Sequence, residues 1–142
     1  LDVFEPALDA KPLDLLLEPH RPYVADVDAI EAAGVDIKGM AHITGGGLIE
    51  NPPRILPDDT TLHLERDAWP VPPLFRWLQD LGNVAESEMH RVFNMGLGLL
   101  VIVPATQAQA AIDAAPTAAW RVGEIRSGEG APNVVFHPAF AE

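Results

Sequence analysis

Proline is the residue type that most restricts how this chain can fold. The sequence contains 14 prolines in 142 residues, spread along most of its length. Each proline fixes φ at about −65° and removes a backbone N–H donor, so it belongs at a turn, at the first turn of a helix or at the end of an element. Because 48% of the residues are hydrophobic, the prolines indicate many fixed turns in a folded protein rather than disorder.

Between the prolines, apolar residues recur with the period of a helix in some segments and of a strand in others. Residues 97–103 are apolar on both faces, as in a central strand, and the short turn at 127–130 suggests a hairpin between the last two strands. Asp26 or Asp28 is expected to cap the second helix, and Asn83 the fifth. Helices are predicted over residues 13–17, 27–33, 48–56, 74–81, 84–93 and 105–115, and strands over 21–27, 35–44, 61–65, 97–103, 120–125 and 134–136. This alternation predicts an α+β fold, with a mixed β-sheet packed with helices.

Composition limits the class of protein. A single domain is the natural expectation at this length. Nine Lys and Arg residues stand against 21 Asp and Glu, a net charge of −12, and an acidic surface repels phosphate backbones and anionic lipid headgroups. Apolar stretches also fall short of the roughly 20 residues that span a bilayer, so we expect no nucleic-acid and no membrane partner. The absence of cysteine excludes disulfides, thiolate metal sites and thiol nucleophiles, and it fits a reducing cytoplasm.

The segment 38–57 differs in composition from the rest of the chain. It holds Lys38 and Arg54 against one acid, Glu50, a local charge of +1 in a protein of charge −12. Three glycines at 45–47 follow a predicted strand, and their N–H groups can approach an anion closely because no Cβ is in the way. A helical turn after them would add the partial positive charge of a helix N-terminus. A plain tight turn is the alternative, since the pattern is neither GxGxxG nor a P-loop.

Polar side chains accompany these glycines. His42 and Thr44 lie two residues apart in a predicted strand, so they point to the same face. His42 could exchange protons near neutral pH, or it could be a structural histidine. Arg54 could form two hydrogen bonds to a phosphate, or it could be a solvated surface residue. Asn51 lies between Thr44 and Arg54 in the sequence. No metal site is predicted, because the other histidines show no metal-ligand spacing: His20, His63, His90 and His137.

The segment 93–98, FNMGLG, is a second candidate, and it joins a helix to the apolar strand. Asn94 can take the left-handed conformation of a helix end. Gly96 and Gly98 allow close approach by a ligand or by a neighbouring segment, and structure alone could explain all three residues. Trp69 and Trp77 are expected to be anchors of the core.

Two runs of sequence carry a family resemblance: HITGGGLIENPPRILP, and the later WPVPPLFRWLQDLGNVAESEMHRVFNMGLG. From residue 12 to residue 136, the chain resembles the C-terminal half of the aminoimidazole ribonucleotide synthetases, also called phosphoribosylformylglycinamidine cyclo-ligases. The long second run is more distinctive than any glycine motif. The resemblance implies a C-terminal domain at residues 12–142, preceded by a linker or arm at residues 1–11.

The resemblance also implies an activity. In this family, ATP phosphorylates the formyl amide oxygen of formylglycinamidine ribonucleotide, the amidine nitrogen attacks, and ADP, phosphate and aminoimidazole ribonucleotide are released. ATP and Mg²⁺ bind mainly to an N-terminal domain that this chain lacks, and that domain forms most of a homodimer. We therefore expect the parent protein to be a cytoplasmic ATP-dependent cyclo-ligase of purine biosynthesis, and this chain alone to be inactive.

Carried over to matching positions, the resemblance implies that His42 is the catalytic residue, in a cleft near the reacting groups. The resemblance also implies a set of residues that bind the substrate or its phosphate. Those of the turn are Thr44, Gly45, Gly46 and Gly47, those that support it are Asn51 and Arg54, and those of the facing wall of the same cleft are Asn94, Gly96 and Gly98.

Two alternatives are open. Other ATP-dependent enzymes share this C-terminal fold, among them formylglycinamidine ribonucleotide synthetase, selenophosphate synthetase, thiamine monophosphate kinase and a hydrogenase maturation factor. The runs at residues 69–79 and 82–96 favour the cyclo-ligase. A binding module without catalysis is the alternative from a different class, and ATP hydrolysis by this chain alone would exclude it.

Overall fold

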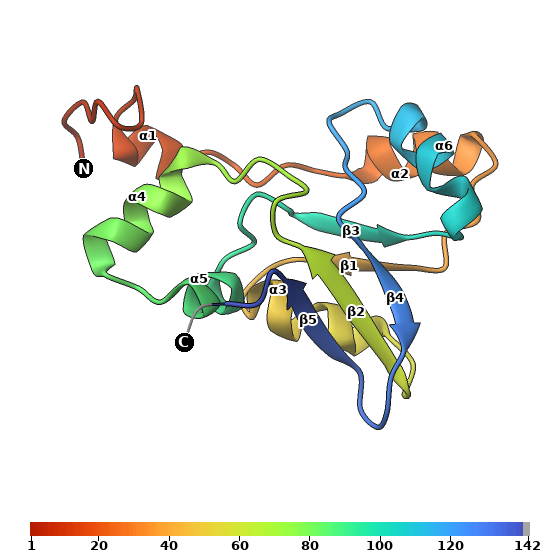
Figure 1. Ribbon diagram of the computed structural model, residues 1–142. Helices are drawn as coiled ribbons and strands as arrows, with labels where there is room; N and C mark the ends of the chain where they lie inside the picture. The colour runs from red at the N-terminus through yellow and green to blue at the C-terminus, as the bar shows by residue number, and fades with distance from the viewer. Residues whose placement is uncertain (141–142) are drawn as a thin grey trace.

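The computed structural model describes residues 1–140. Short helices and two small sheets form an α+β fold, as predicted (Figure 1). In chain order the elements are α1 (Pro12–Leu16), α2 (Val24–Ala32), β1 (Gly39–His42), α3 (Gly47–Glu50), the 3-10 helix η1 (Pro52–Ile55), β2 (Thr60–Glu65), α4 (Pro73–Gly82), α5 (Glu86–Val92), β3 (Leu99–Ile102), the 3-10 helix η2 (Ala105–Gln107), α6 (Ala108–Ala114), β4 (Gly123–Ser127) and β5 (Asn133–His137). Residues 141 and 142 of the predicted domain lie outside the described residues. No helix within residues 1–140 is long and apolar enough to cross a bilayer.

The strands form two separate sheets. β1 and β3 make an antiparallel ribbon, in which His42 lies opposite Leu99. The second sheet has the order β4-β2-β5, with β2 antiparallel to β4 and parallel to β5, so the predicted mixed pairing is confirmed. Along β2, Leu62 and Leu64 are buried, whereas His63 between them is less so, because successive side chains point to opposite faces.

The main core combines side chains from both sheets with those of α3 and α5. Leu48 of α3, Leu64 of β2 and Met89 of α5 are fully buried. Each such side chain stabilises the folded state by about 1.5–3 kcal/mol relative to an exposed one. Trp69 is the core anchor that the sequence predicts: it is 5% exposed, and its Nε1 donates to the Met95 carbonyl oxygen at 2.9 Å.

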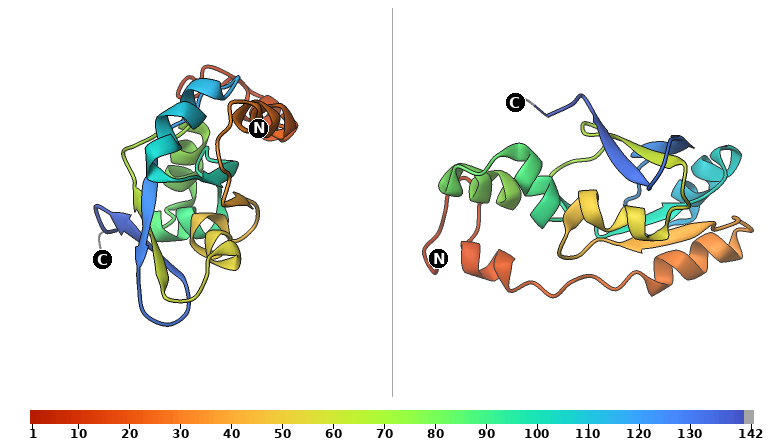
Figure 2. Two further views of the ribbon diagram at one scale, coloured as in Figure 1. Left: turned by 90° about the vertical axis from the view of Figure 1, so that its right-hand side faces the viewer. Right: turned by 90° about the horizontal axis from the view of Figure 1, so that it is seen from below.

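A smaller core lies at one end of the molecule, where α2 and α6 are side by side (Figures 1 and 2). Ile30 of α2 and Val35 pack there with Ala111 of α6. An extended stretch, residues 17–23, connects α1 to α2 along the length of the molecule, as the right-hand view of Figure 2 shows. Aromatic side chains of this stretch contact the end of the β1–β3 ribbon.

The strand predicted at residues 21–27 is wrong, because this region forms the start of α2. Tyr23 and Val24 favour strands by propensity. A helix that begins at Val24, however, buries Ile30 against Ala111 of α6, and this packing outweighs the local preference.

The predicted helix caps are also wrong. α2 has Tyr23 at its N-cap, so neither Asp26 nor Asp28 caps it. Asp26 lies in the first turn, 7% exposed, and accepts a hydrogen bond from the Thr117 hydroxyl at 2.6 Å. Asn83 ends α4 in the left-handed conformation, with φ of 46°, and does not begin α5.

The apolar segment 97–103 is not a central strand. Within residues 1–140, β3 pairs with β1 alone. The segment is apolar on both faces because Leu100 packs in the main core while Val103 packs against the smaller one.

The hairpin predicted at residues 127–130 does not form, since β4 and β5 lie on either side of β2. Residues 128–132 therefore pass the end of β2 and span two strand spacings, about 10 Å. Local turn residues cannot reveal this, because the intervening strand comes from a distant part of the sequence.

Candidate functional site

The three glycines form a turn between β1 and α3. The Ile43 N–H donates to the Gly98 carbonyl oxygen at 2.9 Å, which ties the end of β1 to the segment before β3. The turn then closes through a 2.9 Å hydrogen bond from the Gly47 N–H to the Thr44 carbonyl oxygen. Gly46 and Gly47 have φ of 102° and 54°, a left-handed region that glycine occupies without strain.

Asn51 shapes this turn from inside the protein. Asn51 is buried, and its Nδ2 donates to the carbonyl oxygens of Gly47 at 2.9 Å and Gly45 at 3.2 Å. The Thr44 hydroxyl donates to its Oδ1 at 3.3 Å. The amide of Asn51 is thus engaged with the main chain of the turn.

The glycines of the turn have different surroundings. A Cβ at Gly47 would lie 2.8 Å from the Phe93 carbonyl oxygen and closer still to that of His90, so Gly47 lets α3 pack on the end of α5. A Cβ at Gly45 would meet open space, and Gly45 and Thr44 are exposed. The exposed side of the turn, Thr44 to Gly45, is therefore the part that a ligand can reach.

His42 lies at the end of β1, exposed, beside two aromatic residues of the 17–23 stretch. Its Nε2 is 2.8 Å from the Nε2 of His20. The Tyr23 ring lies edge-on to both imidazoles, with ring centroids 5.7 Å from His20 and 6.4 Å from His42. Burial raises the pKa of Tyr23 above its ordinary value; Arg21 lowers this pKa and Asp26 raises it.

Gly98 lies against this group of rings. A Cβ at Gly98 would collide with the hydroxyl of Tyr23, so the absence of a side chain makes room for that ring. Gly98 was predicted to allow close approach by a ligand or by a neighbouring segment, and the structure shows the neighbouring segment, through Tyr23. Gly98 and His42 are also brought together at the end of the β1–β3 ribbon.

The structure gives Asn94 and Gly96 a turn of their own. The Gly96 N–H donates to Oδ1 of Asn94 at 2.9 Å. Asn94 does not take the left-handed conformation; Met95 and Gly96 do, with φ of 51° and 96°. A Cβ at Gly96 would lie 2.6 Å from Cδ of Pro72, so this glycine accommodates the segment that leads to α4.

A groove of about 550 Å³ runs beside the site. Tyr23, Gly96 and Gly98 line it, together with Arg21 and Asp26, whose side chains form a 3.5 Å ion pair. Most of the remaining lining is apolar, from β3, α6 and the second sheet. Among residues 1–140, the glycine turn and Asn94 do not line this groove, so the structure does not place all the predicted residues in one cavity.

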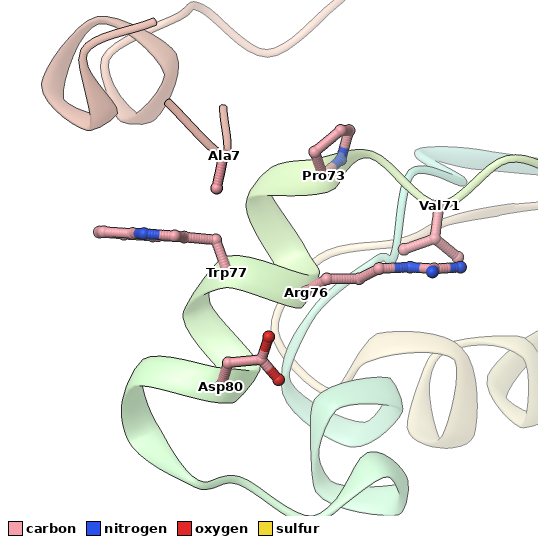
Figure 3. A pocket seen from close by; sticks show the side chains of 6 residues that line it. All are labelled: Ala7, Val71, Pro73, Arg76, Trp77 and Asp80. Carbon is pink, nitrogen blue, oxygen red and sulfur yellow. The ribbon is translucent and has the colours of Figure 1, made fainter. Parts of the chain in front are cut away.

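A second hollow, of about 370 Å³, lies between the N-terminal arm and α4 (Figure 3). In that view Trp77 and Arg76 extend from α4 to opposite sides, and Ala7 of the arm faces Trp77. Trp77 is half-buried at the surface, so its predicted place in the core is wrong. None of the residues 73–82 that form α4 is buried. This hollow is separate from the predicted site residues.

The charges around the glycine turn are partly paired. Lys38 forms an ion pair with Asp36, and Glu50 lies 3.4 Å from Arg91 at the end of α5. Arg54 is exposed in η1, where its backbone N–H donates to the Asn51 carbonyl oxygen at 3.2 Å. Within residues 1–140 there is no group of three or more His, Cys, Asp or Glu side chains placed to hold a metal ion.

His20 and Tyr23 were not predicted to be neighbours of His42. They lie about 20 positions earlier in the chain, and Tyr23 falls in the segment 21–27 that was predicted to be a strand edge. The only sequence signal available was the concentration of His20, Arg21 and Tyr23 within four residues of a proline-bounded stretch.

Comparison with known proteins adds independent evidence. Residues 3–133 match the family described as AIR synthase related protein, C-terminal domain. The chain is similar to the phosphoribosylformylglycinamidine cyclo-ligase of Cupriavidus pinatubonensis, with 50% identity over 134 residues, 89% of this chain and 38% of that protein. The protein of the same name from Burkholderia cenocepacia is 52% identical over 117 residues, 80% of this chain and 33% of that protein. The chain thus spans about a third of the length of the curated relatives it matches.

Proposed function

Because this chain belongs to the AIR synthase related protein C-terminal domain family, we propose that it is the C-terminal part of an ATP-dependent cyclo-ligase of purine biosynthesis. The proposed substrate is formylglycinamidine ribonucleotide, and the products are aminoimidazole ribonucleotide, ADP and phosphate. Residues 12–142 form the C-terminal domain, and residues 1–11 a linker or arm. The observation that carries this proposal is the similarity of most of the chain to proteins that bear this enzyme's name.

The proposed reaction has two steps. The γ-phosphoryl group of ATP passes to the formyl amide oxygen of the substrate while the amide nitrogen loses its proton, which gives a phosphorylated imidate and ADP. The amidine nitrogen then attacks the imidate carbon, the C–O bond to phosphate breaks, and the nitrogen loses a proton as the imidazole ring closes. A side chain that accepts or donates a proton near neutral pH can assist either step, and histidine is suited to this.

His42 is the catalytic residue of this proposal. Its exposed ring at the end of β1 is supported by three features: the adjacent glycine turn, the contact with His20, and the connection of its neighbour Ile43 to Gly98. An exposed residue at the end of a ribbon, next to a turn, is accessible to a substrate while its backbone stays fixed.

The exposed side of the glycine turn is proposed to bind the substrate phosphate or ribosyl group. Thr44 offers a hydroxyl, and Gly45 offers a main chain that no side chain covers. Asn51 and Gly47 act as supports, because their contacts are with the turn and with α5. Gly46 lies between Gly45 and Gly47 in the turn, and Arg54 is an exposed cation nearby in sequence. Asn94, Gly96 and Gly98 form the facing wall of the same cleft.

ATP and Mg²⁺ are proposed to bind mainly outside this chain. Residues 1–140 hold no group of three or more His, Cys, Asp or Glu side chains that could bind the ion by themselves. The relatives are roughly three times as long as the segment that they share with this chain, which leaves room for an N-terminal ATP-binding domain. We propose that this domain is the partner of the chain, that it forms a homodimer, and that the enzyme works in the cytoplasm.

An exchange of segments tests the proposal. The part of the Cupriavidus pinatubonensis protein that matches this chain is replaced by residues 1–142, and ADP release and ring closure are measured. We expect the hybrid protein to be active and the 142-residue chain alone to be inactive.

His42→Ala should lower kcat of the hybrid by about 100-fold or more. His137→Ala, on the outer face of the second sheet, is the matched control. A folded but inactive hybrid would count against the proposed function.

A further inference from the structure

The imidazoles of His20 and His42 form a hydrogen-bonded pair. Their Nε2 atoms are 2.8 Å apart and their ring centroids 4.8 Å apart. A contact this short between two ring nitrogens requires one N–H donor and one bare nitrogen, since two N–H groups would repel and two bare nitrogens would not bond. We propose that His20 is a positioning residue: its hydrogen bond to His42 fixes the orientation of that ring and couples the tautomers of the two rings. The inference rests on the proposed role of His42.

The hydrogen bond has a chemical consequence at the opposite ring nitrogen. A neutral imidazole carries one proton, so the ring that donates through Nε2 has a bare Nδ1, and the ring that accepts at Nε2 carries its proton on Nδ1. The two rings are therefore opposite tautomers. Whether Nδ1 of His42 donates a proton to a ligand or accepts one therefore depends on the tautomer of His20.

Tyr23 and Gly98 hold the pair in place. The Tyr23 ring meets each imidazole at 66°, edge-on, and its hydroxyl end lies against Gly98. Gly98 in turn accepts the hydrogen bond from Ile43, the residue after His42. Arg21 lies over the Tyr23 ring, 5.8 Å from its centroid. The pair is thus held at the end of the β1–β3 ribbon by two segments, the 17–23 stretch through Tyr23 and the segment before β3 through Gly98.

This arrangement matters because both histidines are exposed. An exposed side chain without a partner samples several rotamers, and a displacement of about 1 Å at a catalytic group can cost about 100-fold in rate. His20 supplies the partner from the stretch that connects α1 to α2. The 17–23 stretch is therefore part of the site, and it does more than link two helices.

The hydrogen bond can be measured directly in the 142-residue chain. With ¹⁵N-labelled histidine at neutral to slightly alkaline pH, we expect a scalar coupling across the hydrogen bond between the Nε2 atoms of His20 and His42. The His63–His137 pair is an internal control, since Nδ1 of His63 is 2.8 Å from Nε2 of His137. His20→Ala should remove the first coupling and leave the second. Absence of the His20–His42 coupling in the unsubstituted chain overturns the proposal.

Kinetics of the hybrid protein test the positioning role. We expect His20→Ala to lower kcat by about 10- to 100-fold, with a smaller change in KM, because the ring of His42 is displaced rather than removed. His20→Gln should recover part of the loss, since its amide can donate or accept near the same position. An unchanged kcat for His20→Ala overturns the proposal. An inactive hybrid, or full activity of His42→Ala, would instead contradict the proposed function, and the coupling would still decide whether the pair exists.

Discussion

The side-chain amide of Asn51 holds the main chain of Gly47, to whose carbonyl oxygen its Nδ2 donates at 2.9 Å. Asn51 is 5% exposed, so water does not compete for this hydrogen bond. The same side chain reaches the carbonyl oxygen of Gly45 and accepts from the Thr44 hydroxyl. One buried residue therefore determines the shape of the turn that is proposed to bind the substrate.

Removal of this amide should destabilise the protein. We expect Asn51→Ala to lower the free energy of unfolding by about 1–3 kcal/mol, because the carbonyl oxygens of Gly47 and Gly45 lose the side-chain amide as a donor. Asn51→Asp should cost more, since a carboxylate would face those carbonyl oxygens. Urea unfolding measures both changes, with Asn133→Ala, at an exposed residue of β5, as the control. Equal costs for Asn51→Ala and Asn133→Ala would show that the hydrogen bonds do not hold the turn.

Two glycines of the turn should respond differently to the same substitution. Gly47→Ala places a Cβ 2.8 Å from the Phe93 carbonyl oxygen at a left-handed φ, so we expect a loss of about 2 kcal/mol or more in the free energy of unfolding. Gly45→Ala meets open space and should change it by less than about 0.5 kcal/mol. Thermal or urea unfolding of the two variants measures both changes. Similar losses of unfolding free energy in Gly47→Ala and Gly45→Ala would contradict the packing of α3 on α5.

Tyr23 is the sole tyrosine of the sequence, so ultraviolet absorbance reports its ionisation alone. Burial raises its pKa above the ordinary value of 10.0. Because the folded pKa is the higher one, this contribution to stability is complete below the ordinary value and is lost as pH rises through it toward the folded pKa. Gly98→Ala should displace the ring into solvent and return the pKa toward 10.0, whereas Gly45→Ala should not. An unchanged titration in Gly98→Ala would contradict the contact between Tyr23 and Gly98.

His90 should make the stability of the protein depend on pH near neutrality. It is 3% exposed between Phe136 and Phe140, its Nδ1 donates to the Glu86 carbonyl oxygen at 2.9 Å, and burial lowers its pKa below 6.5. The unfolded state then binds a proton at a higher pH than the folded state. Stability is complete above 6.5 and is lost as pH falls through that value toward the folded pKa.

The test compares urea unfolding at pH 7.5 and 5.5 in the unsubstituted chain and in His90→Phe. A phenyl ring at this position can contact the same two aromatic rings, Phe136 and Phe140, and cannot take up a proton. We expect the loss of stability at the lower pH to be smaller in His90→Phe. If both proteins lose the same amount, the titration of His90 is not the cause.

The sequence was sufficient for elements whose stabilising contacts are local. Helix α4 follows from prolines at its first turn and from apolar residues at helical spacing. β2 follows from its alternation, and the glycine turn from three consecutive glycines. The family resemblance at residues 12–136 identified the fold class, and the family match over residues 3–133 confirms it.

Features that depend on distant contacts could not be predicted. β4 and β5 are separated by β2, which comes more than 50 residues earlier, and no turn motif records this. The pair of His20 and His42 joins residues 22 positions apart, across a segment whose strand propensity concealed the start of α2. The role of Gly47 was hidden for the same reason, because its neighbour is the end of α5.

Substrate binding by this part of the enzyme is tested by a calorimetric titration of the 142-residue chain with formylglycinamidine ribonucleotide at low salt, followed by Mg-ATP. We expect saturable binding of the ribonucleotide, weakened by Asn51→Ala and by substitution of Thr44, and no binding of Mg-ATP. Tight binding of Mg-ATP without binding of the ribonucleotide would contradict the assignment of the substrate to this part of the enzyme.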